Sequence, residues 1–416
     1  MGRRPRYPQA DGTGALTGDR KPPRKTATRL VEGGRRPEWT GAVVNPPVWR
    51  GSTHLYDTHE ELARGHPNAD GHFHYGRRGA PTQWALAEAL TELEPGAAGT
   101  MLYPSGTAAL FSALAAVLES GDRLALTDNA YEPTRAIAFG PLKRMGVETI
   151  TFDPLDHAAF EALVSEGVAA VLLESPGSLT MEVCDVPALA DIAHRHGATV
   201  LLDNTWASPL GFAALDHGAD IAIMSLTKHV GGHSDLLMGS AAGNEKFYRT
   251  LRRAAQLQGQ HVSPDDAALA HRGLRTMQLR LERATENARK VAEWLAGRDE
   301  VAQVLCPLLP GAPGNELWQR DFSGGCGLFS FVLKGRDKAA RGRFLDALDL
   351  FGMGYSWGGY ESLAVPFDPA RIRDRMAWPP AGCANEDVLG IRLSVGLEDS
   401  RDLIADLEQG IAALHA

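Results

Sequence analysis

Between residues 80 and 225, short apolar runs alternate with stretches of helical periodicity, and this alternation restricts the fold more than any other feature. The apolar runs are typical of buried strands and lie at 123–127, 147–152, 168–173, 199–202 and 221–225. The helical patterns lie at 82–93, 106–119, 160–166 and 186–196, and Thr82 is expected to cap the first of them. This order predicts an α/β fold, in which helices cover both faces of a mostly parallel sheet.

The pattern changes after Ser263-Pro264, which suggests a second structural unit. We expect one long helix or two in succession over 265–295, then strands at 328–333 and 390–395 and a last helix at 402–414. The predicted organisation is therefore an N-terminal arm, a large α/β domain and a smaller α+β domain, at 1–79, 80–275 and 276–416. About 30 residues at the start of the arm are expected to be flexible.

Composition argues against a membrane protein and against a disulfide or zinc framework. The longest nearly apolar run, 108–118, is far shorter than the roughly 20 residues that a membrane-spanning helix needs. No apolar core follows the early arginines, so no secretory leader is expected. The four cysteines form no C-x-x-C pair, which favours a reducing, cytoplasmic compartment.

Charge is uneven along the chain. Residues 1–36 contain ten Lys or Arg and three Asp or Glu, a net charge of +7, whereas the whole chain has a net charge of −9. A basic arm can indicate nucleic-acid binding. This arm has one tyrosine and no helical periodicity, and it joins an acidic body, so we do not expect nucleic acid as a partner.

Three clusters of small and polar residues stand where a parallel sheet binds its ligands, beyond the ends of strands. Residues 103–110 form a small-residue turn that opens a helix, where the amides of Gly106 and Thr107 make an anion site. The run 200–205 ends in a carboxylate, Asp203, which by itself can also be a simple helix cap. The third cluster, 221–235, places Lys228 between hydroxyl residues and glycines, where a lysine can have a lowered pKa and act as a nucleophile.

Together these clusters match the needs of pyridoxal 5'-phosphate. This cofactor requires a lysine for its imine, a carboxylate at the pyridine nitrogen, a phosphate cradle and a stacking group. Lys228 follows Asp203 by 25 residues, one strand–helix–strand step, so both are expected at one sheet edge. The remaining predicted cofactor contacts are the amides of Gly106 and Thr107, the hydroxyls of Ser225 and Thr227, and the ring of Tyr131.

Several motifs in order make the resemblance to a known family specific. They are Tyr75-Gly-Arg77-Arg-Gly, Tyr103-Pro-Ser-Gly106-Thr, Asn129-Ala-Tyr131-Glu-Pro, Glu174-Ser-Pro-Gly-Ser-Leu-Thr-Met-Glu-Val, Asp203-Asn-Thr-Trp206, Ser225-Leu-Thr-Lys228, Gly273-Leu-Arg-Thr, Tyr355-Ser-Trp-Gly-Gly-Tyr-Glu-Ser and Ile391-Arg392-Leu-Ser-Val-Gly-Leu-Glu. With these motifs the chain resembles the Cys/Met-metabolism family of pyridoxal-phosphate enzymes over residues 30–416. Within the family it is most similar to bacterial carbon–sulfur β-lyases.

The resemblance implies the fold type I architecture of aspartate aminotransferase and a role for each matching residue. Lys228 is expected to hold the cofactor and shuttle protons, with Asp203 at the pyridine nitrogen and Tyr131 as a candidate acid. The remaining implied contacts are Tyr75 and Arg77 on the neighbouring subunit's phosphate, Arg392 on the substrate α-carboxylate, and Ser356, Trp357 and Asn204 around the substrate. The family is usually a tetramer of two active-site dimers, so a homotetramer is expected, with the arm contacting a neighbouring subunit.

The implied reaction is cleavage of cystathionine to homocysteine, pyruvate and ammonia, a step of transsulfuration and methionine biosynthesis. Where enterobacterial members have an acidic residue and a tyrosine, this chain has Ala136 and Gln256, both expected at the distal end of the substrate. Specificity is therefore expected to be shifted or broadened. Cleavage of cysteine or its conjugates, and γ-lyase or γ-synthase chemistry, remain alternatives within the family.

Other classes fit less well. A nicotinamide-linked oxidoreductase would need a Gly-rich turn after the first strand, which the sequence lacks. His229 and His233 are four residues apart, but Gly231-Gly232 between them disfavours a helical metal site, so no metal is expected. The alternative from another class is a regulatory protein that binds the cofactor through Lys228 without turnover.

Overall fold

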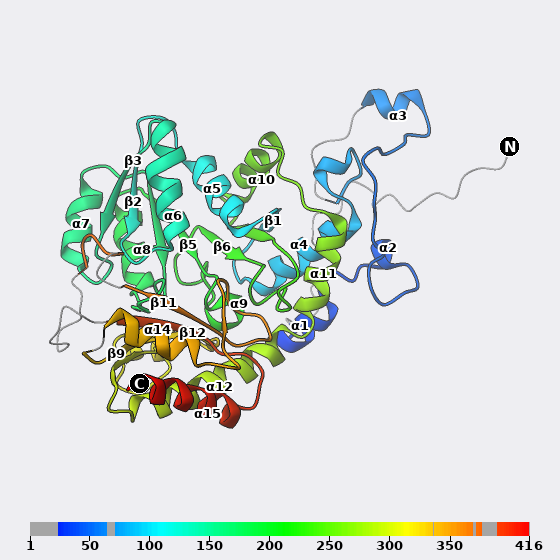
Figure 1. Ribbon diagram of the computed structural model, residues 1–416. Coiled ribbons are helices and arrows are strands. Elements are labelled where there is room, and N and C mark those ends of the chain that lie inside the picture. Colours follow the sequence, from blue (N-terminus) through cyan, green and yellow to red (C-terminus); the bar gives the residue numbers. More distant parts are fainter. Residues whose placement is uncertain (1–23, 65–70, 336, 369–371, 377–388, 416) are drawn as a thin grey trace.

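The computed structural model describes residues 24–64, 71–335, 337–368, 372–376 and 389–415 (Figure 1). Its larger sheet has seven strands in the order β1-β7-β6-β5-β4-β2-β3. These strands are β1 Gly99–Tyr103, β2 Arg123–Thr127, β3 Glu148–Phe152, β4 Ala170–Glu174, β5 Thr199–Asp203, β6 Ile221–Ser225 and β7 Gly239–Gly243. The five strands β3, β2, β4, β5 and β6 are parallel, whereas β7 is antiparallel to its neighbours β1 and β6. The prediction of a mostly parallel sheet is confirmed.

A second, smaller sheet has the order β10-β11-β12-β9-β8. Its strands are β8 Val301–Leu305, β9 Leu328–Leu333, β10 Gly352–Met353, β11 Leu363–Phe367 and β12 Leu389–Ser394. The stretch expected as one or two helices over 265–295 forms two, α11 Pro264–Leu274 and α12 Met277–Ala296. The domain boundary predicted near residue 275 stays a prediction.

Helices flank both sheets (Figure 1). The remaining helices are α1 Thr26–Glu32, α2 Pro37–Thr40, α3 His59–Arg64, α4 Pro81–Leu93, α5 Gly106–Val117, α6 Glu132–Ile137, α7 His157–Ser165, α8 Val186–Arg195, α9 Ser208–Gly211, α10 Tyr248–Leu257, α13 Asn315–Asp321, α14 Lys338–Asp346 and α15 Ser400–Ala413, with a 3₁₀ turn at Gly76–Arg78 and a π-helical turn at Ala138–Leu142. No described helix has the length and apolar character needed to cross a bilayer. The arm residues 1–23, expected to be flexible, lie outside the described residues.

The start of α4 differs from the prediction. The helix begins at Pro81 after Ala80, and Thr82 is not its cap. The Thr82 hydroxyl instead donates to the carbonyl of Pro47 and accepts from the amide of Trp49, each at 2.9 Å. Thr82 therefore holds an arm segment against α4, a tertiary role that local capping preference does not predict.

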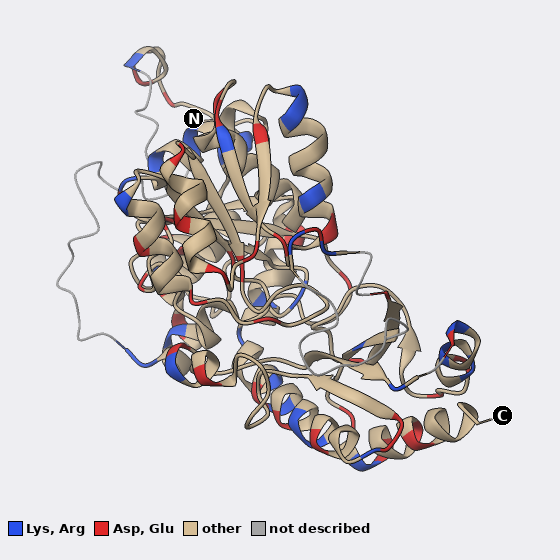
Figure 2. Cartoon of the chain, turned by 90° about the vertical axis from the view of Figure 1, so that its left-hand side faces the viewer, with Lys and Arg blue, Asp and Glu red and all other residues tan. Residues whose placement is uncertain are grey.

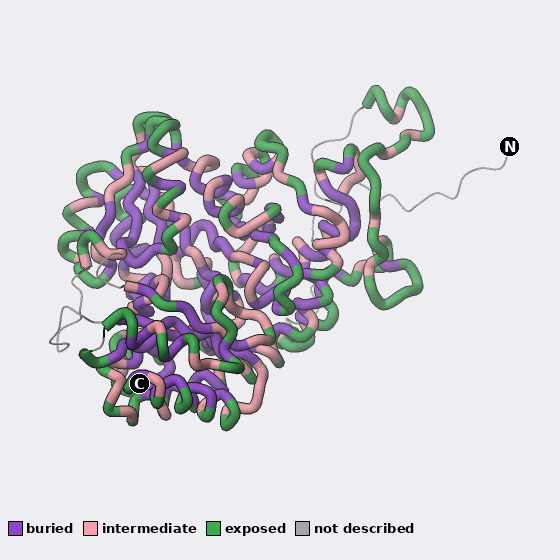
Figure 3. Tube along the Cα trace, in the orientation of Figure 1, coloured by how far each residue is buried: buried purple, intermediate pink, exposed green. Residues whose placement is uncertain are grey.

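One hydrophobic core spans the two sheets. Buried side chains of β4 and β5 belong to the same cluster as those of β9 and α15. Residues of the buried class run through both layers (Figure 3). Trp206 joins the layers, because its ring packs edge-on against Phe322 and its Nε1 donates to the carbonyl of Leu328 at 3.0 Å. Since Trp206 lies three residues after Asp203, this junction sits next to the candidate site.

Candidate active site

Lys228 is held in the turn between β6 and β7. Its backbone amide donates to the carbonyl of Ser225 at 3.1 Å, and the Thr227 hydroxyl exchanges hydrogen bonds with the backbone of Met238. The predicted cradle role of Thr227 stays a prediction, and the hydroxyl already fixes the shape of this turn. The turn presents the Lys228 side chain beyond the carboxyl end of β6, as expected for a ligand site of a parallel sheet.

The Lys228 amine has a lowered pKa. Its Nζ donates to the Ser356 hydroxyl at 2.6 Å and lies 5.2 Å from the centre of the Trp357 ring. Burial lowers the pKa of Lys228 to about 8, the positive charge of Arg392 acts in the same direction, and Asp203 opposes both. A lysine with such a pKa has a substantial neutral fraction near neutral pH, which a nucleophile or general base requires.

Asp203 ends β5, next to β6. Its Oδ1 accepts from the Thr205 amide at 3.0 Å and from the Thr205 hydroxyl at 2.5 Å. The same hydroxyl accepts from the amide of Ser225 at 2.9 Å, so Thr205 fixes the ends of two strands together. Burial raises the pKa of Asp203, whereas the Thr205 hydrogen bonds and the charge of Lys228 lower it. The charged form of a carboxylate that is partly desolvated in this way is stabilised by a cationic partner.

The predicted anion site is built from close backbone approaches. Helix α5 begins at Gly106, and the Ser105 hydroxyl caps it by accepting from the amide of Ala108. A Cβ on Gly106 would lie 2.7 Å from the Ser225 hydroxyl oxygen, and a Cβ on Gly239 would overlap the Ser105 carbonyl oxygen. Glycine at both positions lets this helix start meet the ends of β6 and β7, where its first unpaired amides can hold a phosphate.

Tyr131 borders the site from the end of β2. Its backbone amide donates to Oε2 of Glu174 at 2.7 Å, and its side chain is partly exposed. Burial and the nearby carboxylate of Glu174 raise the pKa of Tyr131, while Arg392 lowers it. A further acidic residue of the site is Glu174, the last residue of β4, which pairs in register with Asp203 at the end of β5. Glu174 was not among the predicted site residues, although the Glu-Ser-Pro motif at a strand end pointed to it.

Arg392 lies on β12 and is 9% exposed. One of its terminal nitrogens donates to the carbonyl of Ser356 at 2.9 Å, but its Nε has no hydrogen-bond partner among the described residues. Burial lowers the pKa of Arg392 to about 10. A buried guanidinium with an unused donor fits a carboxylate ligand, because its hydrogen bonds would then be completed. Ser356 has a φ of +90°, a strained conformation beside Lys228.

Tyr75 and Arg77 are exposed and lie apart from this group. Tyr75 is 48% exposed, and the guanidinium of Arg77 donates to the backbone carbonyl of Gln256 within the same chain. Gln256 belongs to α10, whereas Ala136 is exposed on α6. The single chain does not test the predicted contacts of Tyr75 and Arg77 with a neighbouring subunit.

The structure does not bring Asn204 into the site. Its side chain is 1% exposed, and its amide nitrogen donates to the carbonyl of Phe212 at 2.8 Å. It lines a small cavity of about 10 Å³ together with Glu94, and each residue has one oxygen there without a partner among the described residues. Successive strand residues point to opposite faces, so Asp203 faces the site and Asn204 faces the interior. This buried position does not support the expected contact of Asn204 with substrate, which stays a prediction.

We expect the Glu94→Gln variant to lose a pH dependence of stability. Burial raises the pKa of Glu94 to about 8 from 4.5, so between these values the folded state keeps a proton that the unfolded chain releases. The free energy of unfolding then falls as pH rises, by on the order of 3 kcal/mol, and a glutamine at this position cannot contribute to this fall. Urea unfolding at pH 5 and pH 8 tests this expectation, and equal pH dependence in wild type and variant would contradict it.

His229 is buried next to the site and packs against its residues. It is 4% exposed, its Nε2 lies 3.0 Å from the carbonyl oxygen of Trp206, and its ring packs on Trp357. Burial lowers the pKa of His229 to about 3, so the ring is neutral at physiological pH. In the described part of the chain, no three His, Cys, Asp or Glu side chains gather as a metal site would require.

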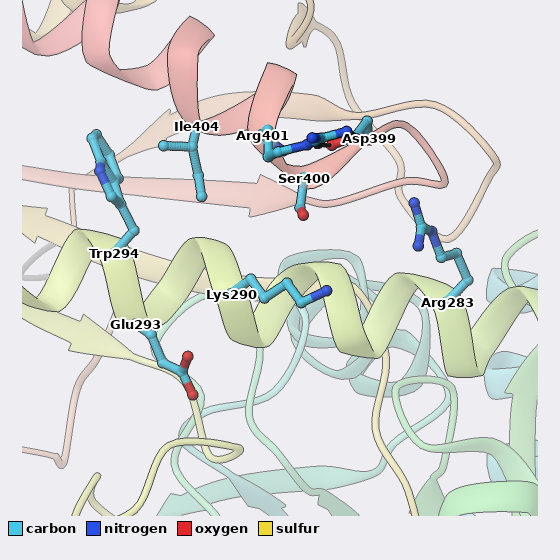
Figure 4. A pocket seen from close by; sticks show the side chains of 8 residues that line it. All are labelled: Arg283, Lys290, Glu293, Trp294, Asp399, Ser400, Arg401 and Ile404. Carbon is cyan, nitrogen blue, oxygen red and sulfur yellow. Dashed lines mark hydrogen bonds and ion pairs between the residues drawn. The ribbon is translucent and has the colours of Figure 1, made fainter.

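A groove of about 650 Å³ lies elsewhere, between α12 and α15. Figure 4 shows that charged side chains of both helices line it, including Arg283, Lys290 and Asp399. Acidic and basic residues are mixed along these two helices (Figure 2). Lys290 pairs with Glu286 and Asp399 pairs with Arg401, so the charges in the groove are largely neutralised within the chain.

Comparisons with known proteins agree with this geometry. A family model described as Cys/Met metabolism PLP-dependent enzyme matches residues 27–412. Cystathionine beta-lyase MetC of Escherichia coli (strain K12) is 43% identical over 395 residues, with 94% of this chain and 99% of that protein covered. Cystathionine beta-lyase of Salmonella typhimurium (strain LT2) is 42% identical over 391 residues, with 93% and 98% covered. The solved structure of cystathionine gamma synthase from Xanthomonas oryzae pv. oryzae has a TM-score of 0.85 at 32% identity and covers 95% and 99% of the two chains.

Proposed function

The chain belongs to the Cys/Met metabolism family of PLP-dependent enzymes, and on this premise we propose that it is a carbon–sulfur β-lyase which cleaves cystathionine to homocysteine, pyruvate and ammonia. The observation that carries the choice of reaction is the similarity to two cystathionine beta-lyases at 42–43% identity over nearly the whole chain. The geometry supports the chemistry, because a lysine with a lowered pKa and a half-buried carboxylate lie at adjoining strand ends.

The residues present fit pyridoxal 5'-phosphate. Its ring nitrogen, aldehyde and phosphate require a carboxylate, an amine and an anion site. The half-buried carboxylate of Asp203, the amine of Lys228 and the helix start opposite Ser225 match these needs. When bound, the cofactor supplies an electron sink for the negative charge left at Cα of the substrate. In this proposal, Gly106, Thr107, Ser225 and Thr227 hold the phosphate.

The proton steps fall to the chain's own side chains. In the proposal, Lys228 Nζ removes the Cα proton, and the Ser356 hydroxyl, 2.6 Å away, orients the amine toward it. Asp203 stabilises positive charge on the ring nitrogen, and Thr205 fixes the carboxylate for this purpose. Lys228 or Tyr131 then donates a proton to the leaving thiolate.

Arg392 binds the substrate in this proposal. Its unused Nε and one terminal nitrogen provide a fork for the α-carboxylate, with Ser356 and Trp357 as the neighbouring wall. Tyr131 stacks on the cofactor ring from the side of β2. We further propose a cytoplasmic homotetramer in which Tyr75 and Arg77 reach the neighbouring subunit's phosphate, since both side chains are exposed on the arm.

The reaction is tested by the products formed from cystathionine. We expect pyruvate and homocysteine in equal amounts, because β-elimination breaks the bond between sulfur and the carbon next to Cα. The likeness to a cystathionine gamma synthase structure keeps γ chemistry as the second candidate. Release of 2-oxobutyrate with cysteine would assign γ-elimination instead, and binding of the cofactor without turnover of any thioether would indicate a regulatory protein.

A further inference from the structure

The connection between β11 and β12 contacts the larger sheet through residues 372–376. The backbone amides of Asp374, Arg375 and Met376 all donate to the carboxylate of Asp128, at 2.8 to 3.1 Å. Asp128 directly follows β2 and is 0% exposed. In Figure 1 this orange-red segment lies against the layer of the larger sheet, away from the strands that precede and follow it.

Two arginines reinforce this contact. Arg135 on α6 donates to Asp128 Oδ1 at 3.1 Å and also pairs with Asp374. From the other side, Arg373 donates to the carbonyl of Ser178 at 2.7 Å, and its side chain is 3% exposed. The contact therefore combines a buried carboxylate, three consecutive backbone amides and an arginine from each of the two segments. These charged hydrogen bonds make it stronger than an ordinary loop contact.

The contact meets the site at Tyr131. Asp128 lies three residues before Tyr131 in the same strand-end loop. Ser178, which Arg373 binds, donates its own amide to the carbonyl of Asn129 at 2.8 Å. Segment 372–376 thus secures the loop that carries Tyr131, and it belongs to the connection that leads to β12 and Arg392.

We infer that Asp128 is a positioning residue, which docks segment 372–376 and so sets Arg392 on the smaller sheet relative to Tyr131 on the larger one. This inference rests on the proposed function, in which Arg392 binds the substrate carboxylate and Tyr131 stacks on the cofactor. The carboxylate is required because an asparagine would place a donor either against the three amides at Oδ2 or against Arg135 at Oδ1. Loss of docking should weaken substrate binding more than it slows chemistry, because Lys228 and Asp203 lie on other strand ends.

The test uses the holoenzyme and the variants Asp128→Asn and Asp406→Asn. Asp406 is a matched control, because its buried carboxylate accepts from the amides of Asp349, Leu350 and Phe351 within the smaller domain. We expect D128N to raise KM for cystathionine about tenfold with kcat within about threefold of wild type, and D406N to leave KM unchanged. Hydrogen exchange at the amides of 374–376 should accelerate about tenfold or more in D128N alone.

Each other outcome overturns the inference. An unchanged KM in D128N, an equal rise in D406N, or a fall in kcat without a change in KM would each do so. If D128N does not fold, Arg373→Gln removes the opposite end of the contact, and the same KM rise and exchange are required of it. A wild-type enzyme that makes no pyruvate refutes the proposed function, whereas wild-type turnover with protected amides and no KM effect refutes the positioning role alone.

Discussion

The Lys228→Ala variant is expected to lose activity on cystathionine by at least about 10⁴-fold in kcat/KM. In the proposal this amine both holds the cofactor and moves the Cα proton, and loss of a positioned base alone costs roughly 10² to 10⁴. The lowering of its pKa to about 8 by burial and its hydrogen bond to Ser356 are consistent with this proposed role. Single-turnover assays of pyruvate formation measure the loss, and the absorbance of the protein reports cofactor binding.

The control for this variant is Lys290→Ala, which removes an exposed lysine paired with Glu286 on α12. It should keep wild-type activity and the visible absorption band of the bound cofactor, which borohydride removes from wild type and which Lys228→Ala should lack. Partial recovery of activity with a small amine in the buffer would support a base role for Lys228. Activity of Lys228→Ala near the wild-type level would contradict the assignment of the lysine.

The sequence predicts those strands whose own residues show a clear strand pattern. Strands β2, β6 and β9 were predicted with the bounds that the structure has, because each is an apolar run between polar or Gly-rich turns. Strand β7 was missed, since Gly-Ser-Ala-Ala-Gly has low β propensity and is a strand only because it pairs with β1 and β6. Such tertiary pairing is not visible in local sequence.

The site residues also divide into those that the sequence predicts and those that it does not. The spacing between Lys228 and Asp203 predicted a shared sheet edge because consecutive parallel strands end together. Thr205, which joins the ends of β5 and β6 through its hydroxyl, could not be assigned from spacing alone. The role of Asp128 likewise could not be predicted, because the backbone amides that it binds lie some 250 positions further along the chain. The motif next to Asp203 suggested a substrate contact for Asn204, but motif proximity does not distinguish the two faces of a strand, and this contact stays a prediction.

The Asp203→Asn variant is expected to lower kcat for pyruvate formation by about 10³-fold while the protein still binds the cofactor. Removal of one preorganised group aimed at charge in the transition state costs roughly 10² to 10³ in kcat. Asparagine keeps the shape and can still accept from Thr205, so the loss measures charge and not packing. In the proposed mechanism the effect arises because a neutral amide does not stabilise a positively charged ring nitrogen.

The matched control is Asp220→Asn, which neutralises a buried carboxylate at the opposite end of the same sheet. Asp220 precedes β6 and accepts from the backbone amide of Val200 and the side chain of Asn244, each at 3.0 Å. It should lower thermal stability without changing kcat, because no reacting group is expected at that edge. If both variants lost activity in proportion to stability, the charge of Asp203 would be structural. A kcat loss confined to Asp203→Asn requires instead that the carboxylate act on a charge of the reacting groups, at the sheet edge where β5 ends next to β6 and Lys228.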